Sequence, residues 1–148
     1  MTTTTTTRST PTGSVYATGA VTGLVAAALS TLFGHSWADA ALLVAVIAVV
    51  TVVVFGVVVP RGLRHESPGR PALTMAVLAA LLSVPAFWSG LPLVLGVGAM
   101  LLGNAGRTAR TGAGPCIAAL VIGSLTTLFY LFIYVSEALA GKGGFLFD

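Results

Sequence analysis

Residues 40–59 read AALLVAVIAVVTVVVFGVVV, a run of twenty residues that has no charged side chain and only one hydroxyl, that of Thr51. About 20 apolar helical residues cross the hydrocarbon core of a bilayer, which is about 30 Å thick. A helix on the surface of a soluble protein would show a polar face, and this run has none. A lone strand would leave its backbone unpaired in lipid. The run therefore predicts a transmembrane helix over residues 38–60 that ends at Pro60.

The composition leaves no material for a large water-soluble domain. Of the 148 residues, 56% are hydrophobic and 7% are charged, and the mean hydropathy is +1.01. Soluble domains carry about 25% charged residues. The net charge of +3 comes from basic residues in short loops, so it indicates membrane orientation and not nucleic-acid binding. A single cysteine, Cys116, excludes an internal disulfide.

Four further apolar segments complete the predicted fold, an all-α integral membrane bundle of about five transmembrane helices. They cover about residues 14–33, 71–88, 91–105 and 115–138. Unbroken, residues 72–105 would form a helix of about 50 Å, which is too long for the bilayer. We therefore place a turn at residues 88–92. Because the segment 91–105 is short, four spans plus one re-entrant segment remain the alternative.

Polar segments lie at both ends of this transmembrane domain, which covers residues 14–140. Residues 1–13 contain an unbroken threonine run, Thr2 to Thr7. The segment has no apolar periodicity, and we expect a disordered cytoplasmic tail. Residues 141–148 form a second, short tail.

The basic residues predict the orientation of the bundle. With five spans, the N-terminal tail and the loops at 61–70 and 106–114 share one side, which holds six of the seven Lys and Arg residues. Only Lys142 lies opposite. The positive-inside rule then places the N-terminus in the cytoplasm and the C-terminus outside the cell membrane. Trp37, Trp88 and Tyr134 then lie near the outer interface, where aromatic belts form.

Small residues recur at helical spacing on three of the predicted spans. Such faces let another helix backbone approach closely. The residues are Gly19, Gly23 and Ala27 in the first span, Gly96, Ala99 and Gly103 in the fourth, and Ala119 and Gly123 in the fifth. We expect them to be helix-packing sites, with contacts within the chain favoured over dimerisation.

The central part of every predicted span lacks Asp, Glu, Lys, Arg and His. Buried ionisable residues mark proton relays and ion-coupled transport, so their absence argues against proton-coupled export. His35, Asp39 and Glu137 at the outer edge are candidate metal ligands, although residues at the water boundary need no such role. The hydroxyls within the spans are expected to bond to carbonyls of their own helices. The sequence thus predicts no catalytic residue and no cofactor.

The last two predicted spans and their loop read PLVLGVGAMLLGNAGRTARTGAGPCIAALVIGSL from Pro92 to Leu125. An apolar helix ending in Leu-Gly is followed by a basic, glycine-containing loop and a helix rich in small residues. This arrangement resembles a helical-hairpin module of small actinobacterial multi-pass membrane proteins of unknown function. The positions that carry the resemblance are Gly96, Gly103, Arg107, Gly112, Ala119 and Gly123. The resemblance implies a packed hairpin and supplies no activity.

Two functional hypotheses from different classes follow. The first is a non-enzymatic structural or accessory subunit that lies in the lipid bilayer and packs against a membrane-protein partner or further copies of itself. The alternative is a small channel or transporter without a buried ion-coupling carboxylate. Its polar path would pass Thr51, Ser83, Ser124, Thr127 and Tyr130.

Overall fold

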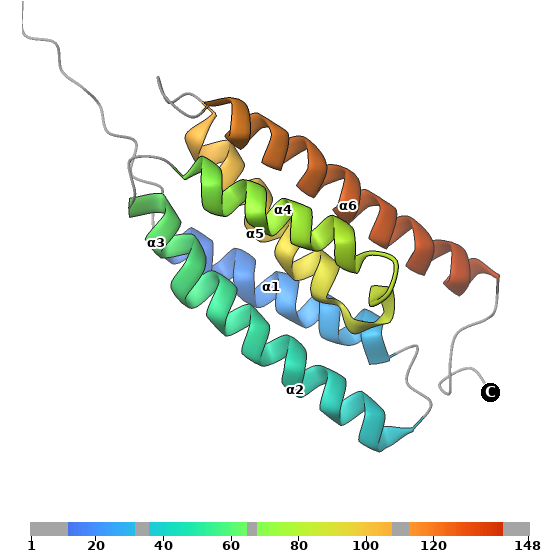
Figure 1. Cartoon of the computed structure of the whole chain (residues 1–148). Helices are drawn as coiled ribbons and strands as arrows, with labels where there is room; N and C mark the ends of the chain where they lie inside the picture. The colour runs from blue at the N-terminus through green and yellow to red at the C-terminus, as the bar shows by residue number, and fades with distance from the viewer. Residues whose placement is uncertain (1–11, 32–35, 65–67, 108–112, 141–148) are drawn as a thin grey trace, which may run out of the picture.

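The computed structural model describes residues 12–31, 36–64, 68–107 and 113–140. Within these ranges the chain forms five helical rods and no strand, so the predicted all-α class is confirmed. Successive rods alternate in direction along the bundle (Figure 1).

The second rod is continuous from Trp37 to Arg64 and contains one irregular turn. It consists of α2 (Trp37–Val53), the π-helical turn η1 (Val54–Val58) and α3 (Val59–Arg64). The first rod is α1 (Thr12–Thr31). The later elements are α4 (Gly69–Leu82), the short 3-10 turn η2 (Phe87–Ser89), α5 (Leu91–Gly106) and α6 (Ala113–Leu139).

The described helices fall into two length classes. Those at Gly13–Thr31, Trp37–Arg64 and Ala113–Glu137 are long and apolar enough to cross a membrane. α4 has 14 residues and α5 has 16. At 1.5 Å per residue these two are about 21 and 24 Å long, shorter than a hydrocarbon core of about 30 Å.

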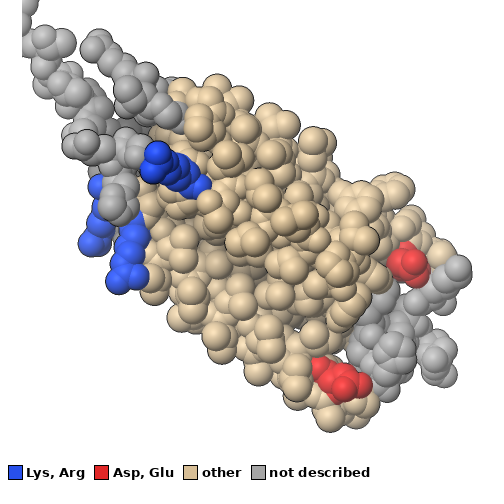
Figure 2. Space-filling model, viewed as in Figure 1, with Lys and Arg blue, Asp and Glu red and all other residues tan. Residues whose placement is uncertain are grey.

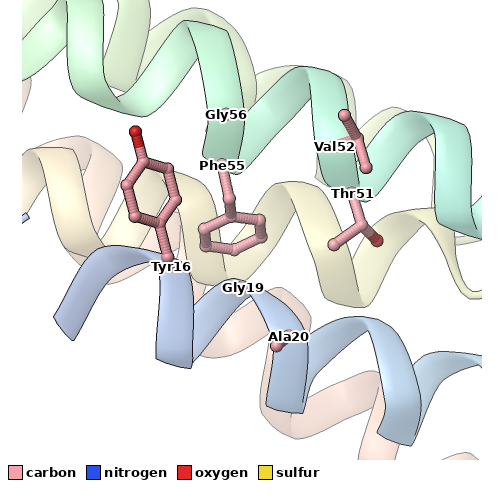
Figure 3. A pocket seen from close by; sticks show the side chains of 7 residues that line it. All are labelled: Tyr16, Gly19, Ala20, Thr51, Val52, Phe55 and Gly56. Carbon is pink, nitrogen blue, oxygen red and sulfur yellow. The ribbon is translucent and has the colours of Figure 1, made fainter. Parts of the chain in front are cut away.

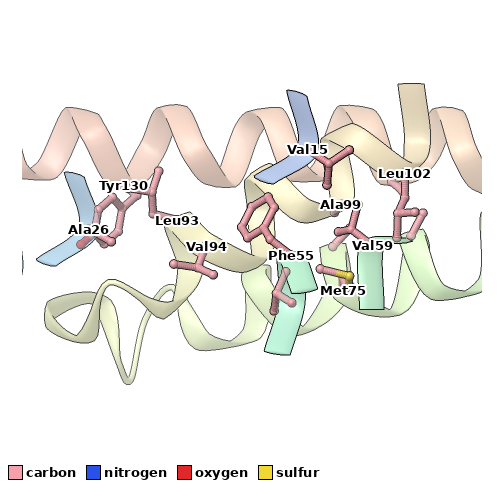
Figure 4. Packing of buried hydrophobic residues seen from close by; sticks show 14 of the residues in the cluster. Val15, Ala26, Phe55, Val59, Met75, Leu93, Val94, Ala99, Leu102 and Tyr130 are labelled. Atoms are coloured by element: carbon pink, nitrogen blue, oxygen red, sulfur yellow. The ribbon is translucent and has the colours of Figure 1, made fainter. Parts of the chain in front are cut away.

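The short helix α5 lies at the centre of the bundle. It contacts α1, α2, α3, α4 and α6, and most of its residues are buried. Figure 4 shows side chains of α5, such as Leu93 and Leu102, in the same cluster as Phe55, Met75 and Tyr130 from the surrounding helices.

The most hydrophobic stretch of the sequence, residues 40–59, lies at the perimeter instead. Leu42, Val49 and Val52 are 65%, 64% and 68% exposed. In a soluble fold such a helix would be the one buried. Here the apolar surplus faces outward, and the central helix consists largely of small and medium-sized residues.

Pro60 does not end the second rod as the sequence predicted, because the helix continues through it to Arg64. A proline has no N–H, and its ring clashes with the carbonyl four residues earlier. Just before Pro60 the backbone widens: the N–H of Val59 donates to the carbonyl oxygen of Val54, five residues back. This π-helical turn gives the ring space, and the rod continues.

The break between α4 and α5 comes earlier than the predicted end of the third span at residue 88. α4 stops at Leu82, and residues 83–90 form the turn. Gly90 has φ 69°, a conformation that glycine adopts without strain. A Cβ there would lie 2.8 Å from Ser30 Oγ, so the position also needs a residue without a side chain.

Candidate functional site

The small residues of α5 and α6 lie where these two helices touch backbone to backbone. A Cβ added at Gly103 would lie 2.6 Å from the carbonyl oxygen of Cys116, and one at Gly123 would lie 2.8 Å from that of Gly96. Ala99 and Ala119 are fully buried. Any larger side chain on these faces would push the two backbones apart.

The small residues of α1 face the second rod. A Cβ at Gly19 would lie 2.6 Å from Cβ of Phe55, and one at Gly23 would lie 2.9 Å from Cγ2 of Thr51. Ala27 is half-buried and packs against the central cluster. These faces are therefore occupied by contacts within the chain, and they supply no argument for a partner surface.

An apolar groove, which we call the α1–α2 groove, lies beside this contact. It consists of two adjoining cavities of about 350 and 390 Å³ that share Ala20, Thr51 and Val52. The first cavity extends to Tyr16 and Gly56, with Phe55 against Gly19 in its floor (Figure 3). The second extends in the other direction along the two helices, and it is further lined by Gly23, Leu24, Ala27, Val44, Ile47 and Ala48.

The charged side chains of the described residues separate to the two ends of the bundle (Figure 2). The basic end, as we name it, carries the exposed Arg61, Arg64, Arg70 and Arg107. Asp39 and Glu137 lie at the opposite end. A wide belt without Lys, Arg, Asp or Glu lies between the two ends in this view.

The candidate metal ligands are not brought together among the residues that the structure describes. His35 lies outside the described ranges. The carboxylate of Asp39 accepts a hydrogen bond from Ser36 Oγ at 2.8 Å, and Ser36 Oγ accepts one from the backbone N–H of Asp39, which caps α2. Glu137 is half-buried near the end of α6, and the described residues contain no group of three His, Cys, Asp or Glu side chains that could hold a metal ion. Asp39 therefore has a structural role at the start of its helix.

The hydroxyls within the helices follow the sequence expectation only in part. Ser83 Oγ donates to the carbonyl of Ala79 at 2.8 Å, as expected. Ser30 Oγ and Thr51 Oγ1 are buried and have no hydrogen-bonding partner among the described residues, so the expectation is wrong for them. The Thr127 hydroxyl lies 3.9 Å from Met100 Sδ on the neighbouring helix α5. For Ser30, Thr51 and Thr127, packing against neighbouring helices therefore determines where the hydroxyl lies.

Two tyrosines on α6 form a buried pair that the sequence analysis missed. Tyr134 was expected in an interfacial belt, but only 2% of it is exposed and its hydroxyl donates to the carbonyl of Phe87 at 3.3 Å. The rings of Tyr130 and Tyr134 lie 4.5 Å apart between centroids. Tyr130 OH is buried without a partner among the described residues. Their four-residue spacing was the available signal, since it places both on one helix face.

The polar residues proposed for a permeation path lie in different interfaces. Thr51 is between α1 and α2, Thr127 is between α5 and α6, and Ser83 bonds within its own helix. Of these residues, Thr51 alone lines the two cavities of the α1–α2 groove.

No family model, no curated protein and no solved structure matches this chain. The fold and the groove alone define its class, an all-helical bundle that has an apolar perimeter and three helices of transmembrane length.

Proposed function

We propose that the chain is a multi-pass protein of the cell membrane and serves as a non-enzymatic structural or accessory subunit. All five rods cross the bilayer, with the N-terminus in the cytoplasm and the C-terminus outside. We also propose that the last two helices form a helical hairpin like the module of small actinobacterial membrane proteins that they resemble.

The apolar perimeter carries this proposal. Leu24, Leu128 and Phe132 are 71%, 63% and 70% exposed and come from helices at both ends of the sequence. Soluble monomers rarely expose continuous apolar patches larger than a few hundred Å². In lipid the same surface is solvated by acyl chains, and the cost of exposing it disappears.

The segregated charges support the same arrangement. Charge in the bilayer centre is costly, and the described Lys, Arg, Asp and Glu residues lie at the two ends. With the basic end in the cytoplasm the bundle obeys the positive-inside rule. The packing of the interior supports the structural or accessory role, because apolar side chains from every rod fill it.

Fractionation followed by mild purification tests the proposal. We expect the tagged chain to stay in the membrane pellet after an alkaline carbonate wash. Affinity purification from native membranes should then retain a second membrane protein in fixed stoichiometry. Release by carbonate would overturn membrane insertion, and a chain purified without any partner would overturn the accessory role.

The second candidate is a small channel or transporter for uncharged polar solutes. The buried hydroxyls of Ser30 and Tyr130, which have no partner in the described residues, favour it. A water-filled path would supply the missing hydrogen bonds. Solute flux into proteoliposomes above that of empty liposomes, reduced by Tyr130→Phe, would support this candidate, and flux equal to the empty control would contradict it.

A further inference from the structure

We propose that the α1–α2 groove binds one acyl chain of an anionic phospholipid, whose headgroup phosphate pairs with Arg61 and Arg64 at the basic end. The inference rests on the proposed membrane insertion. It deepens that proposal by assigning a site and a ligand class.

The length of the groove matches one leaflet of a bilayer. Its lining on the second rod runs from Gly56 to Val44, twelve residues apart. At 1.5 Å per residue this is about 18 Å, whereas half of the hydrocarbon core is about 15 Å. A partner transmembrane helix would need contacts across the whole core. The observed groove suits an acyl chain that enters from one side.

The walls of the groove suit a flexible hydrocarbon. The small residues Gly19, Ala20 and Gly23 line the groove on α1, and branched side chains such as Val52 border it on the second rod. Thr51 is the hydroxyl residue shared by both cavities, but its Oγ1 is buried against α1 and its position offers a bound molecule no exposed polar atom. The surface that remains is apolar, as an acyl chain requires.

The charges at the two ends of the bundle select the headgroup. Arg61 is exposed and lies five residues beyond Gly56, which is about 7.5 Å along the rod. Arg64 is exposed one turn further. Guanidinium groups bind phosphate oxygens through paired hydrogen bonds. The opposite end carries Asp39, which repels an anionic headgroup, so only a lipid of the leaflet at the basic end fits.

Tyr16 marks the level of the headgroup. It is 50% exposed and lies at the Gly56 end of the groove, with its ring extending from α1 toward the second rod (Figure 3). Tyrosines at this depth place the ring among acyl chains and the hydroxyl among headgroups. Tyr16 would therefore border the glycerol region of the bound lipid.

Lipid retention in native mass spectrometry tests the site. The full chain is reconstituted in bilayers of equal phosphatidylglycerol and phosphatidylcholine and then released in mild detergent. We expect one retained lipid per chain, with about a fivefold preference for phosphatidylglycerol. Arg61→Gln should lower the preference several-fold and keep total retention. Arg107→Gln, which removes an exposed charge at the same end, should change neither.

Filling the groove tests the acyl-chain part of the proposal. Ala20→Phe should lower retention of both lipids, and Ala48→Phe from the opposite wall should repeat the effect. Ala80→Phe on the exposed face of α4 is the matched control and should retain lipid like the wild type.

Three results would overturn the inference while leaving membrane insertion intact. They are equal retention of the two lipids by the wild type, unchanged retention by both groove variants, and a lipid-free dimer that Ala20→Phe dissociates. The dimer result would mean that the groove binds a second copy of the chain. Failure of the proposed function is read separately, from release of the chain in the carbonate wash.

Discussion

At the scale of the residue, the effect of replacing a glycine by alanine depends on which atoms the added methyl group would contact. Gly103→Ala should destabilise the bundle by about 1–3 kcal/mol, because the obstacle at 2.6 Å is the carbonyl oxygen of Cys116 and backbone yields poorly. Unfolding in mixed micelles with increasing SDS measures the change.

Gly114→Ala is the matched control, since it lies in α6 and has nothing within 4 Å of its added Cβ. Alanine stabilises helices relative to glycine by about 0.5–1 kcal/mol, so this variant should be neutral or slightly more stable. Equal losses for the two variants would mean that α5 and α6 do not meet at Gly103.

The tyrosine pair provides a second residue-scale prediction. Tyr134→Phe removes a hydrogen bond to the carbonyl of Phe87 and should cost about 0.5–1.5 kcal/mol. Tyr130→Phe removes a buried hydroxyl without a partner among the described residues and should leave stability equal or higher. The same SDS titration compares them. A loss for Tyr130→Phe as large as that for Tyr134→Phe would show that water or a solute pairs with this hydroxyl.

At the scale of the element, the part of the second rod beyond Pro60 docks onto α5. A Cβ at Gly62 would lie 2.7 Å from Cδ2 of Leu102, the flexible end of a fully buried side chain. Gly62→Leu should cost about 1–3 kcal/mol by overpacking, and Leu102→Ala should cost about 2–5 kcal/mol through the cavity it leaves.

The double variant Gly62→Leu/Leu102→Ala should recover part of both losses, with a coupling of about 0.5–3 kcal/mol, because the leucine moves across the interface into the vacated space. A double-mutant cycle in SDS measures the coupling. Strictly additive losses, or a neutral Gly62→Leu, would contradict the docking of α3 against α5.

Sequence reasoning located the helices but misjudged what happens inside the second rod. The local rule that proline stops a helix is sound, and a π-helical turn overrode it. That turn lets Val54 and Val59, joined by an i to i+5 hydrogen bond, both be buried. Such a phase shift depends on packing against other helices, and no pattern within residues 40–59 encodes it.

The groove was invisible to sequence analysis for a similar reason. Gly19 and Gly23 were expected to be packing positions, and they do face the second rod. The space beside them depends on which residues stand opposite, above all Phe55 and Thr51. Spacing along one helix identifies a small face, but the cavity belongs to two helices.

At the scale of the whole molecule, hydropathy marks the exposed perimeter of the bundle better than it marks the core. Residues 40–59 gave the largest signal and lie at the perimeter, whereas the short α5 lies at the centre. A central membrane helix needs small residues for close approach and needs little bulk. The sequence therefore predicted the fold class, but its hydropathy did not indicate which helix lies at the centre.

The separation of charges between the two ends of the bundle predicts on which side of the membrane each end lies. A reporter fused after Asp148 should read outside the membrane, as active alkaline phosphatase and a dark fluorescent protein. One fused after Glu66 should read cytoplasmic, beside Arg61 and Arg64. The two shortest rods decide the outcome, because α4 and α5 cross a core of about 30 Å only with local thinning of the bilayer. A cytoplasmic reading after Asp148 would require an even number of crossings. It would contradict the alternation of the five rods, in which α6 ends opposite the basic end (Figure 1).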